Sequence, residues 1–475
     1  MPLFRSMILC LTLLSLLQAG PVHDTAFSFE YRGFEDNRHI FITNHDKSDS
    51  IGIVFNAGKE IRTSRESVSQ SFRIRLSELR DGLHTLGINY YGNGILLEHK
   101  KFSFFKEKER ILLKRSFLWI SRFDFAHLIS RKDFSTQADY SQRIQEILST
   151  IIINASKSGI TDIIFQVRGS GDVFYKSAIE PFSHLLSLEG IIGEDPGWDP
   201  LEFAVSTCRR HNLQIHAWIN TFPIEHQQRA KLAVKNSIIL PVRKLGPLLA
   251  KDRNGNLPSS KGYIFLHPAH RGTYEYIIKI LDELIKNYDL DGIHFDYFRL
   301  DSSKYIYNEE IQEEYNSLDV KSSYEAFIKD RINEHLKGFS EFIKSGSSDI
   351  TVSVAVIGKM KGTGFSAENH FQDPAMWLNE NLVDLIFPMT YYFPQSIEHM
   401  KDYITFVKPE NHPRIIPGIG AYLTLKREKN HPFSYITNSY NVIYETGNFG
   451  GTAFFSGESL ETNRFWGRIK NLILN

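Results

Sequence analysis

A single carboxylate follows a short buried strand in the second half of the chain. Residues Gly292–Phe295 are apolar enough for a strand, and Asp296 comes directly after them. Residues 274–285 repeat apolar side chains every three or four positions, which predicts a helix that leads into this strand. A carboxylate at the carboxyl end of a parallel barrel strand is a candidate acid, base or nucleophile. We therefore expect Asp296 to be catalytic, and a structural aspartate paired with Arg299 is the alternative.

The elements that must position Asp296 repeat as strand and helix after Ser116. Apolar runs of strand length recur there and are separated by segments with helical periodicity. The expected strands lie near residues 117–120, 162–167, 214–219, 292–295, 350–356, 385–389, 414–418 and 451–455. Eight strands that alternate with helices predict an α/β fold of the (β/α)8 or TIM-barrel type over residues 116–475.

Polar and aromatic residues lie on or just beyond the ends of these strands, where they can hydrogen-bond a ligand or stack against it. The expected binding residues are Arg168, Tyr175, His216, Trp218, Asn220, His294, Tyr391 and Tyr392. A place in the core is the alternative for Trp218, and a satisfied position inside the barrel is the alternative for His216 and His294. The stretch Thr221–Leu266 lacks clear periodicity and is expected to form a long upper loop beside these residues.

Composition argues against several kinds of partner. Lys plus Arg and Asp plus Glu are balanced at 55 each, so net charge gives no basis for binding nucleic acid or an acidic membrane surface. Aromatic residues make up 13% of the chain, which suits a protein that stacks rings against the flat apolar faces of sugars and equally suits a large core.

The region before the barrel divides into an export signal and a small all-β unit. Arg5, the apolar run Met7–Leu17 and the small residues Ala19-Gly20 predict a signal peptide over residues 1–20, so we expect an exported, periplasmic or extracellular protein without a stable membrane anchor. Cys208 is then the single cysteine of the mature chain, which excludes an internal disulfide and a cysteine zinc site. Residues 24–110 contain short alternating runs between turn signals, which predict an immunoglobulin-like β-sandwich.

Five groups of residues after Ser116 occur in the order and spacing of a known family. They are Ile164–Arg168 with Gly171–Tyr175, Gly197–Phe203, Ile215–Asn220, Asp291–Tyr297 and Pro388–Tyr392. On these motifs the chain resembles the bacterial glycosyl-hydrolase-like family ten proteins, relatives of enzymes that cut peptide-free peptidoglycan glycan strands. The resemblance implies a barrel that hydrolyses glycosidic bonds in a polysaccharide, with peptidoglycan glycan strands as the candidate substrate and no cofactor. The chain departs from many relatives at Asp296, where they carry two adjacent aspartates, and at His267-Pro268-Ala269, where they often have Asp-Pro-Gly.

A glycosidase needs two carboxyl groups, about 5 Å apart for retention of configuration or about 6.5–9.5 Å apart for inversion. Asp296 is the first. We expect the second to be Glu458, after the eighth strand, or Asp172, after the second strand, and a helix cap or satisfied loop carboxylate is the alternative for each. The substrate-assisted mechanism of family 18 chitinases is not expected, because their acid position falls here on Phe298, which has no proton to donate.

Two other functions fit parts of the same pattern. The first is a metal-dependent carbohydrate deacetylase whose ligands would be His216, His267, His270, His294 and Asp296. These histidines lack the regular spacing of a zinc-binding helix. The second is a carbohydrate-binding barrel without catalysis, which the missing second aspartate keeps open.

Overall fold

The structure is a computed structural model that describes two parts of the chain in different detail. Side chains are described for residues 115–474, except for residues 227–231, 236–239, 258–261, 301, 320–321, 348, 426–430 and 446–448. Before residue 115 the described residues are those of backbone strands. The expected signal peptide, residues 1–20, lies outside the described residues apart from the short strand Leu9–Leu11.

Eight parallel strands form the barrel that the alternating pattern predicts, which confirms the expected α/β class. They are β10 (Arg115–Ile120), β11 (Asp162–Arg168), β12 (Gln214–Asn220), β15 (Gly292–Asp296), β16 (Thr351–Ile357), β17 (Leu385–Met389), β18 (Gly418–Ile419) and β19 (Gly451–Phe455). Neighbouring strands follow chain order from β10 to β17, and β19 and β18 continue the sheet on the other side of β10. A parallel bridge between Ile386 of β17 and Ile415, just before β18, joins the two edges.

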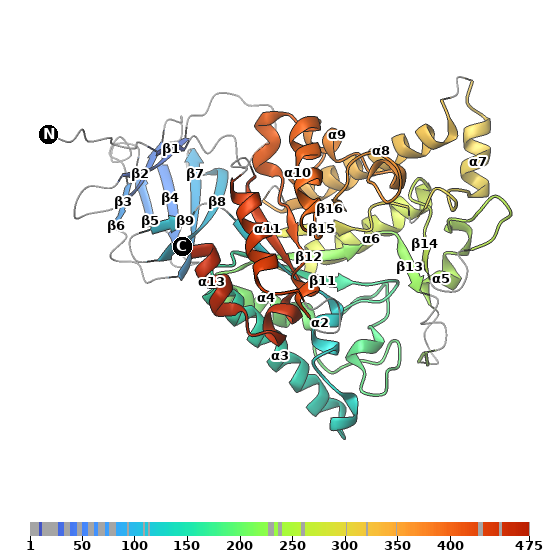
Figure 1. The fold of residues 1–475 in the computed structure, drawn as a ribbon, viewed down its shortest axis with the longest axis horizontal. Helices are drawn as coiled ribbons and strands as arrows, with labels where there is room; N and C mark the ends of the chain where they lie inside the picture. The colour runs from blue at the N-terminus through green and yellow to red at the C-terminus, as the bar shows by residue number, and fades with distance from the viewer. Residues whose placement is uncertain are drawn as a thin grey trace.

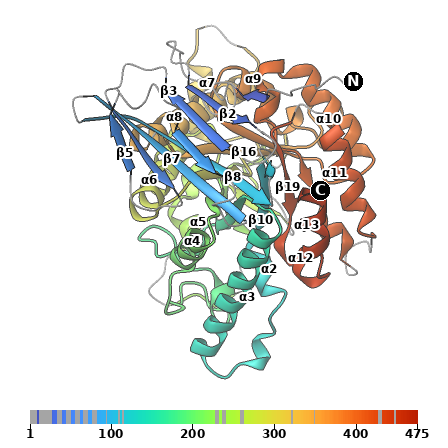
Figure 2. The ribbon, with the colours of Figure 1, turned by 90° about the vertical axis from the view of Figure 1, so that its left-hand side faces the viewer.

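Helices surround the strands, as Figures 1 and 2 show from two directions. The helices are α2 (Arg122–Ala126), α3 (Gln137–Lys157), α4 (Pro200–Arg210), α5 (Pro241–Lys244), α6 (Arg271–Asn287), α7 (Glu309–Asn316), α8 (Tyr324–Gly346), α9 (Pro374–Asn379), α10 (Gln395–Phe406), α11 (Ser434–Glu445), α12 (Gly457–Thr462) and α13 (Trp466–Leu474). Helix α6 buries Ile277, Leu281 and Leu284, which lie on the face that the periodicity predicts, and four residues separate its end from the start of β15. The expected helix before Asp296 is therefore confirmed.

The seventh strand is shorter than the span 414–418 predicts. A short 3-10 helix covers residues 409–414, and regular strand pairing is confined to Gly418 and Ile419. Pro413 and Pro417 have no backbone N–H to donate to a neighbouring strand, which explains why regular pairing fails in an otherwise apolar run. Arg414 instead donates from its guanidinium to Asn381 Oδ1 at 2.8 Å and to the Asp384 carbonyl at 2.9 Å.

The expected irregular loop after β12 contains a small antiparallel sheet. Strand β13 (Pro223–His226) pairs with β14 (Tyr263–Phe265), and this pair brings Tyr263 back towards the barrel. Helix α5 lies between the two strands in the sequence. The loop therefore has more regular structure than its composition predicts, because the paired residues lie 37 to 42 positions apart in the chain, beyond any local signal.

Two antiparallel sheets are described before the barrel. Their strands are β1 (Leu9–Leu11), β2 (Phe27–Arg32), β3 (His39–Asn44), β4 (Ser50–Phe55), β5 (Ile61–Ser64), β6 (Phe72–Arg75), β7 (Gly82–Gly92), β8 (Ile95–Glu107) and β9 (Arg110–Leu112). One sheet has the order β1-β2-β3-β6 and the other β5-β4-β7-β8-β9. The sandwich predicted for residues 24–110 depends on side-chain packing that lies outside the described residues, so it stays a prediction. None of the helices in the described part of the chain is long and apolar enough to span a bilayer.

Candidate functional site

Asp296 ends strand β15 at the carboxyl end of the barrel, with 7% of its surface exposed. Its Oδ1 accepts hydrogen bonds from the Tyr297 backbone N–H at 2.6 Å and from Arg299 Nη1 at 3.1 Å. Within the described residues both bonds fall on Oδ1, so Oδ2 is left for a substrate or water. Tyr297 has a φ of 50°, an unfavourable conformation for a tyrosine, and such strain concentrates at functional sites. The predicted pairing with Arg299 is present, and it occupies one carboxylate oxygen.

A basic and aromatic cluster from three segments of the chain lies beside Asp296. The Arg299 guanidinium lies 4.3 Å from the centre of the Tyr297 ring, and the Tyr263 ring lies 5.2 Å from the same ring. Arg122, which follows β10, donates from Nη2 to Tyr263 Oη at 3.2 Å. Burial, and then the neighbouring Tyr263, raises the pKa of Tyr297, while the two arginines oppose this rise. The Tyr297 phenol therefore remains a hydrogen-bond donor at neutral pH.

Tyr391, which follows β17, belongs to the same site. Its ring stacks on Phe455 with a centroid separation of 5.5 Å, and its edge meets Trp119 at 6.3 Å. Burial, and then the charge of Asp296, raises the pKa of Tyr391 well above its usual value. Tyr391 therefore keeps its proton within the electrostatic reach of Asp296. Tyr392 points elsewhere: it is 47% exposed, and its hydroxyl accepts a hydrogen bond from Tyr422 at 3.1 Å.

A buried hydrogen-bonded chain lies next to Asp296. Asn220 is its partner in the β12–β15 register, and Asn220 Oδ1 accepts from Trp218 Nε1 at 3.0 Å and from Gln166 Nε2 at 3.2 Å. Gln166 Oε1 in turn accepts from the Arg122 backbone N–H at 3.0 Å. Because these side chains satisfy one another, they hold the Trp218 ring and the start of the Arg122 segment in one arrangement.

The two other predicted carboxylates lie in separate surroundings. Asp172 is 1% exposed, accepts from the Ser170 backbone N–H at 2.9 Å and lies 3.9 Å from Arg122 Nη1. Its contact with Arg122 connects it to the Asp296 cluster and favours a positioning role. Glu458 lies in the first turn of α12, where Oε2 is 3.2 Å from His127 Nδ1, and the His127 side chain is 45% exposed.

Asp124 is a further carboxyl group on the Glu458 side, and sequence reasoning missed it. Its Oδ2 accepts from the Glu458 backbone N–H at 3.0 Å, and its Oδ1 accepts from Ser121 Oγ at 2.5 Å. Burial raises the pKa of Asp124 to about 6, against the lowering effect of the Ser121 hydrogen bond. Asp124 thus accepts a hydrogen bond from a backbone N–H in the first turn of α12, the helix that carries Glu458.

Arg168 is the last residue of β11, at the strand end where the sequence places it, but Arg168 and Tyr175 are both enclosed by other parts of the protein. Arg168 is fully buried and donates from Nε and Nη2 to the two oxygens of Glu180 at 2.8 and 2.7 Å. Its Nη1 donates to backbone carbonyls just after β12, including Thr221 at 3.2 Å. Tyr175 is also fully buried and packs edge-on against Tyr288 at 5.8 Å. These contacts indicate that Arg168 and Tyr175 hold the loops in place, rather than contact the substrate as we expected.

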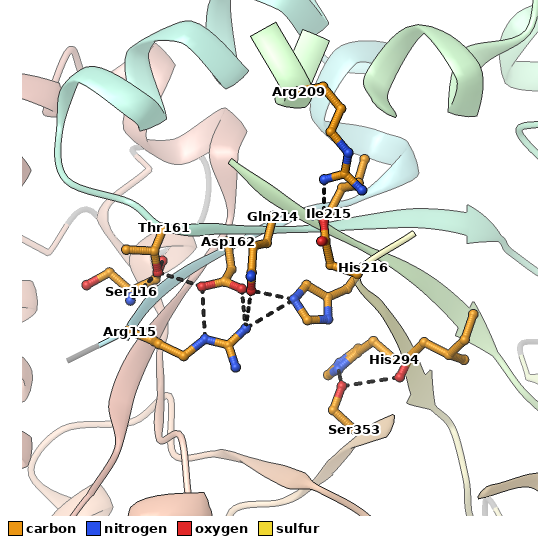
Figure 3. A network of polar contacts seen from close by, with 12 residues as sticks. Arg115, Ser116, Thr161, Asp162, Arg209, Gln214, Ile215, His216, His294 and Ser353 are labelled. Atoms are coloured by element: carbon orange, nitrogen blue, oxygen red, sulfur yellow. Dashed lines mark hydrogen bonds and ion pairs between the residues drawn. The ribbon is translucent and has the colours of Figure 1, made fainter. Parts of the chain in front are cut away.

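His216 lies in the amino-terminal half of the barrel, below the mouth. Figure 3 shows its ring directed at Asp162, beside Arg115 and Gln214. His216 Nε2 is 3.0 Å from Asp162 Oδ1, and His216 is paired in the sheet with Gly292, four residues before Asp296. Burial disfavours the charge on Asp162, but Arg115 and His216 outweigh it and hold the pKa of Asp162 well below its usual value. The alternative of a satisfied interior histidine therefore describes His216 better than a substrate contact.

His294 lies at the centre of the barrel and is fully buried. Trp119 Nε1 is 3.2 Å from His294 Nε2, and His294 Nδ1 is 2.9 Å from Ser353 Oγ. Because an indole only donates, His294 Nε2 accepts and Nδ1 carries the proton. Burial, and then the nearby His216, lowers the pKa of His294 far below its usual value. A neutral histidine with both nitrogens engaged is a core group, so for His294 the interior alternative fits better.

The histidines proposed as metal ligands are engaged separately. His267 Nε2 is 2.9 Å from the Ile306 carbonyl, and His270 Nε2 is 3.0 Å from Glu310 Oε2. Across the residues that the structure describes, no three side chains of His, Cys, Asp or Glu are grouped so that they could hold a metal ion. No specific contact therefore supports the deacetylase alternative.

Arg122, Gln166 and Tyr263 were missed by sequence reasoning. The strand-end rule that selected Asp296 applies equally to Gln166 on β11 and to Arg122 just after β10, so a signal for them was present. Tyr263 had no local signal, because only the β13–β14 pairing brings it to Arg122. Gly169 shows how close this packing is: a Cβ atom there would lie 1.8 Å from Arg122 Nη1.

Comparison with known proteins agrees with this architecture. The solved glycoside hydrolase domain of PgaB (BpsB) from Bordetella bronchiseptica matches 76% of this chain and 99% of that chain at a TM-score of 0.56 and 10% identity, which shows the fold. Glycosyl hydrolase YngK of Bacillus subtilis (strain 168) is 25% identical over 279 residues, which span 55% of this chain and 51% of YngK. Glycosyl hydrolase DigH of Escherichia coli (strain K12) is 24% identical over 333 residues, which span 66% of this chain and 74% of DigH. The model of the glycosyl hydrolase-like 10 family matches residues 117–417, and the chain belongs to that family.

Proposed function

We propose that this protein is a glycoside hydrolase that cleaves a polysaccharide at the carboxyl end of its barrel. The observation that carries the proposal is Asp296, which ends β15 near Tyr391 and Tyr297 and whose two hydrogen bonds within the described residues both fall on one carboxylate oxygen. Flat rings and hydrogen-bond donors around one carboxylate suit a sugar ring and its hydroxyl groups. The glycosyl hydrolase names of YngK and DigH support the same reaction class.

Asp296 acts as the nucleophile or base in this proposal. Arg299 and the Tyr297 N–H both bind Oδ1, so they orient the carboxylate and leave Oδ2 directed at the sugar or at the attacking water. The phenols of Tyr391 and Tyr297 keep their protons and donate to sugar oxygens. Cleavage also needs a proton for the leaving oxygen, which the second carboxyl group supplies.

Glu458 is the stronger candidate for that second carboxyl group. Asp172 is held by Ser170 and Arg122 and is fully enclosed, whereas Glu458 lies beside His127, which is partly open to solvent. The His127 contact therefore places Glu458 next to a group that reaches the solvent. Asp124 and its hydrogen bond to the Glu458 backbone position this group.

Peptidoglycan glycan strands are the proposed substrate. The signal peptide predicted at residues 1–20 would export the protein, and the predicted sandwich at residues 24–110 would lie next to the barrel in the chain. An exported glycosidase meets cell-wall glycan outside the cytoplasm, in agreement with the family that the motifs resemble. The test uses glycan strands with and without stem peptides, alongside unrelated polysaccharides.

The two ends of strand β15 offer a matched experiment. Asp296→Asn keeps the size of the side chain and removes its charge, so we expect the rate of reducing-end release to fall about 100-fold or more, with little change in melting temperature. Asp291→Asn, just before the strand, serves as the control. Asp291 Oδ2 bonds Arg209 at 2.5 Å and the Ile215 N–H at 2.8 Å, so this variant should melt earlier and keep its turnover per folded molecule.

Three results would point elsewhere. An Asp296→Asn protein that melts like the parent and retains full hydrolysis would overturn the assignment. Acetate release without new reducing ends would favour the deacetylase. Binding of the polymer by parent and variant, with no hydrolysis by either, would favour a barrel that only binds carbohydrate.

A further inference from the structure

A hollow of about 630 Å³ has the loop after β15 and the start of α8 on one side and the loop after β16 on the other. Ser302, Glu325 and Lys329 line one wall, and Gly364, Asn369 and His370 line the other. Both loops leave the carboxyl ends of their strands, which is the end of the barrel where Asp296 lies. Sites for small ligands have volumes of about 300–1,000 Å³, so this hollow is large enough for a sugar unit.

The hollow is tied directly to the Asp296 segment. The Leu300 backbone N–H donates to the His370 carbonyl at 3.3 Å, and Gln372 Nε2 donates to the Phe298 carbonyl at 3.4 Å. Ser302 follows Asp296 by six residues, so the chain can separate them by at most about 20 Å. A ligand in the hollow and a ligand at Asp296 therefore lie within reach of one oligosaccharide.

The β16 loop presents an aromatic ring at the edge of this hollow. Phe365 is 60% exposed, and its ring meets His370 edge-on at 4.6 Å. Its neighbours hold the loop in a defined shape, because Asn369 Nδ2 donates to the carbonyls of Gly362 and Gly364 at 3.0 and 2.9 Å. The φ angles of these two glycines, 98° and 84°, lie in the left-handed region. The loop therefore holds an exposed aromatic ring in a defined place next to His370, where it is available for stacking on a flat sugar face.

The side chains that line the hollow suit a sugar ligand. Glu325, Glu368 and Asn369 are exposed and present oxygen and amide groups, and Lys329 supplies a cation that pairs with Asp373 at 2.6 Å. Polar groups of both hydrogen-bonding types beside one flat ring match the hydroxyl edge and the apolar face of a pyranose. A wholly apolar partner would leave these polar groups without partners, and an anionic one would meet two carboxylates.

We propose that the hollow beside Phe365 is a distal subsite that binds a sugar unit of the same glycan chain whose scissile bond lies at Asp296. This proposal rests on the proposed function and extends it: the protein acts on polymers longer than its shortest cleavable unit. Phe365 stacks on the sugar face, and Glu325, Asn369 and Glu368 bind the hydroxyl groups. Neither residue type nor spacing in the sequence marks this site, because one wall comes from the segment after β15 and the start of α8 and the other from the loop after β16.

The test separates binding from catalysis. Affinity for glycan oligomers of increasing length is measured by calorimetry on Asp296→Asn protein, with and without Phe365→Ala. We expect Phe365→Ala to weaken binding of long oligomers about tenfold, equal to about 1.4 kcal/mol, and to have a smaller effect on the shortest ones. Ala326→Phe fills the hollow from the side of α8 and should weaken the binding of long oligomers in the same way.

Tyr444→Ala is the matched control. Tyr444 is 57% exposed, but it lies beside Arg115 and Gly451, where β10 and β19 begin, at the opposite end of the barrel. Its loss should leave affinity unchanged at every length. Equal affinity of parent, Phe365→Ala and Ala326→Phe for long oligomers would overturn the subsite, even if Asp296→Asn has abolished hydrolysis. Conversely, a length-dependent loss together with an Asp296→Asn protein that still hydrolyses would support the subsite and overturn the catalytic assignment.

Discussion

Acid should destabilise the barrel through His267, and the size of this effect follows from the structure. His267 is fully buried, its Nε2 contacts the Ile306 carbonyl at 2.9 Å, and its Nδ1 accepts from the Ala269 N–H at 3.3 Å. Both nitrogens are satisfied in the neutral form with the proton on Nε2. Burial therefore lowers the pKa of His267 from 6.5 to about 4, against the smaller raising effect of the Ile306 hydrogen bond.

The sign and the window follow from these two pKa values. The folded state binds a proton less readily than the unfolded state, so stability is complete above pH 6.5 and falls as the pH drops towards 4. At about pH 5, protonation of His267 in the unfolded state raises the equilibrium constant of unfolding by a factor of about 30. This lowers the free energy of unfolding by about 2 kcal/mol. Below the folded pKa the loss reaches about 3 kcal/mol.

The loss of stability due to His267 is measured by urea unfolding of the parent and of His267→Gln from about pH 7 to about pH 4. Glutamine retains a donor for the Ile306 carbonyl and cannot take up a proton. We expect the free energy of unfolding of the parent to fall by about 2 kcal/mol more than that of the variant between neutral pH and about pH 5. His294, whose pKa is also lowered, acts equally in both proteins and cancels in the comparison. Parallel pH dependences for the two proteins would refute the reasoning, as would an imidazole that titrates near pH 6.5 in the folded protein by NMR.

Two further predictions follow from the same interior. Gly292→Ala should lower the free energy of unfolding by about 1–3 kcal/mol, because its Cβ would lie 1.9 Å from His216 Nδ1 and both groups are held in the sheet; an unchanged urea midpoint would contradict this. Removing divalent ions with a chelator should leave hydrolysis and melting temperature unchanged, since the candidate histidine ligands are engaged with separate partners; activity that disappears and returns with zinc would favour the metal-dependent alternative.

The polar interior of the barrel favours one of the two alternatives that the sequence left open for the histidines. His216 and His294 lie on strands with strand-end motifs, so the same pattern that selected Asp296 also selected them. Their rings instead point into the barrel, where Asp162 and Ser353 satisfy them. A strand pattern alone gives the side of the sheet on which a residue lies but not its height along the barrel axis relative to other strands.

The carboxylates illustrate the same limit. Asp296 could be selected from sequence because it directly follows a short apolar strand at the end of a strongly periodic helix. The surroundings of Glu458 and Asp172 could not be predicted from the sequence. They depend on His127, Asp124 and Arg122, which come from the segment after the first strand. That segment meets both only when the barrel closes and brings β10 between β11 and β19.

Local periodicity determined the elements of this protein. Apolar runs of strand length and helical repeats recur with a regular spacing, and each depends on residues close together in the chain, so seven of the eight strands could be located to within two residues at each end. The seventh strand was shortened by prolines that were themselves visible in the sequence. Only tertiary structure decided the site: the pairing of Tyr263 with Arg122, the orientation of Asp296 by Arg299 and the hollow beside Phe365. Each of these joins residues from different loops or sets the direction of a side chain, and such contacts are governed by barrel register and packing rather than by neighbours in the chain.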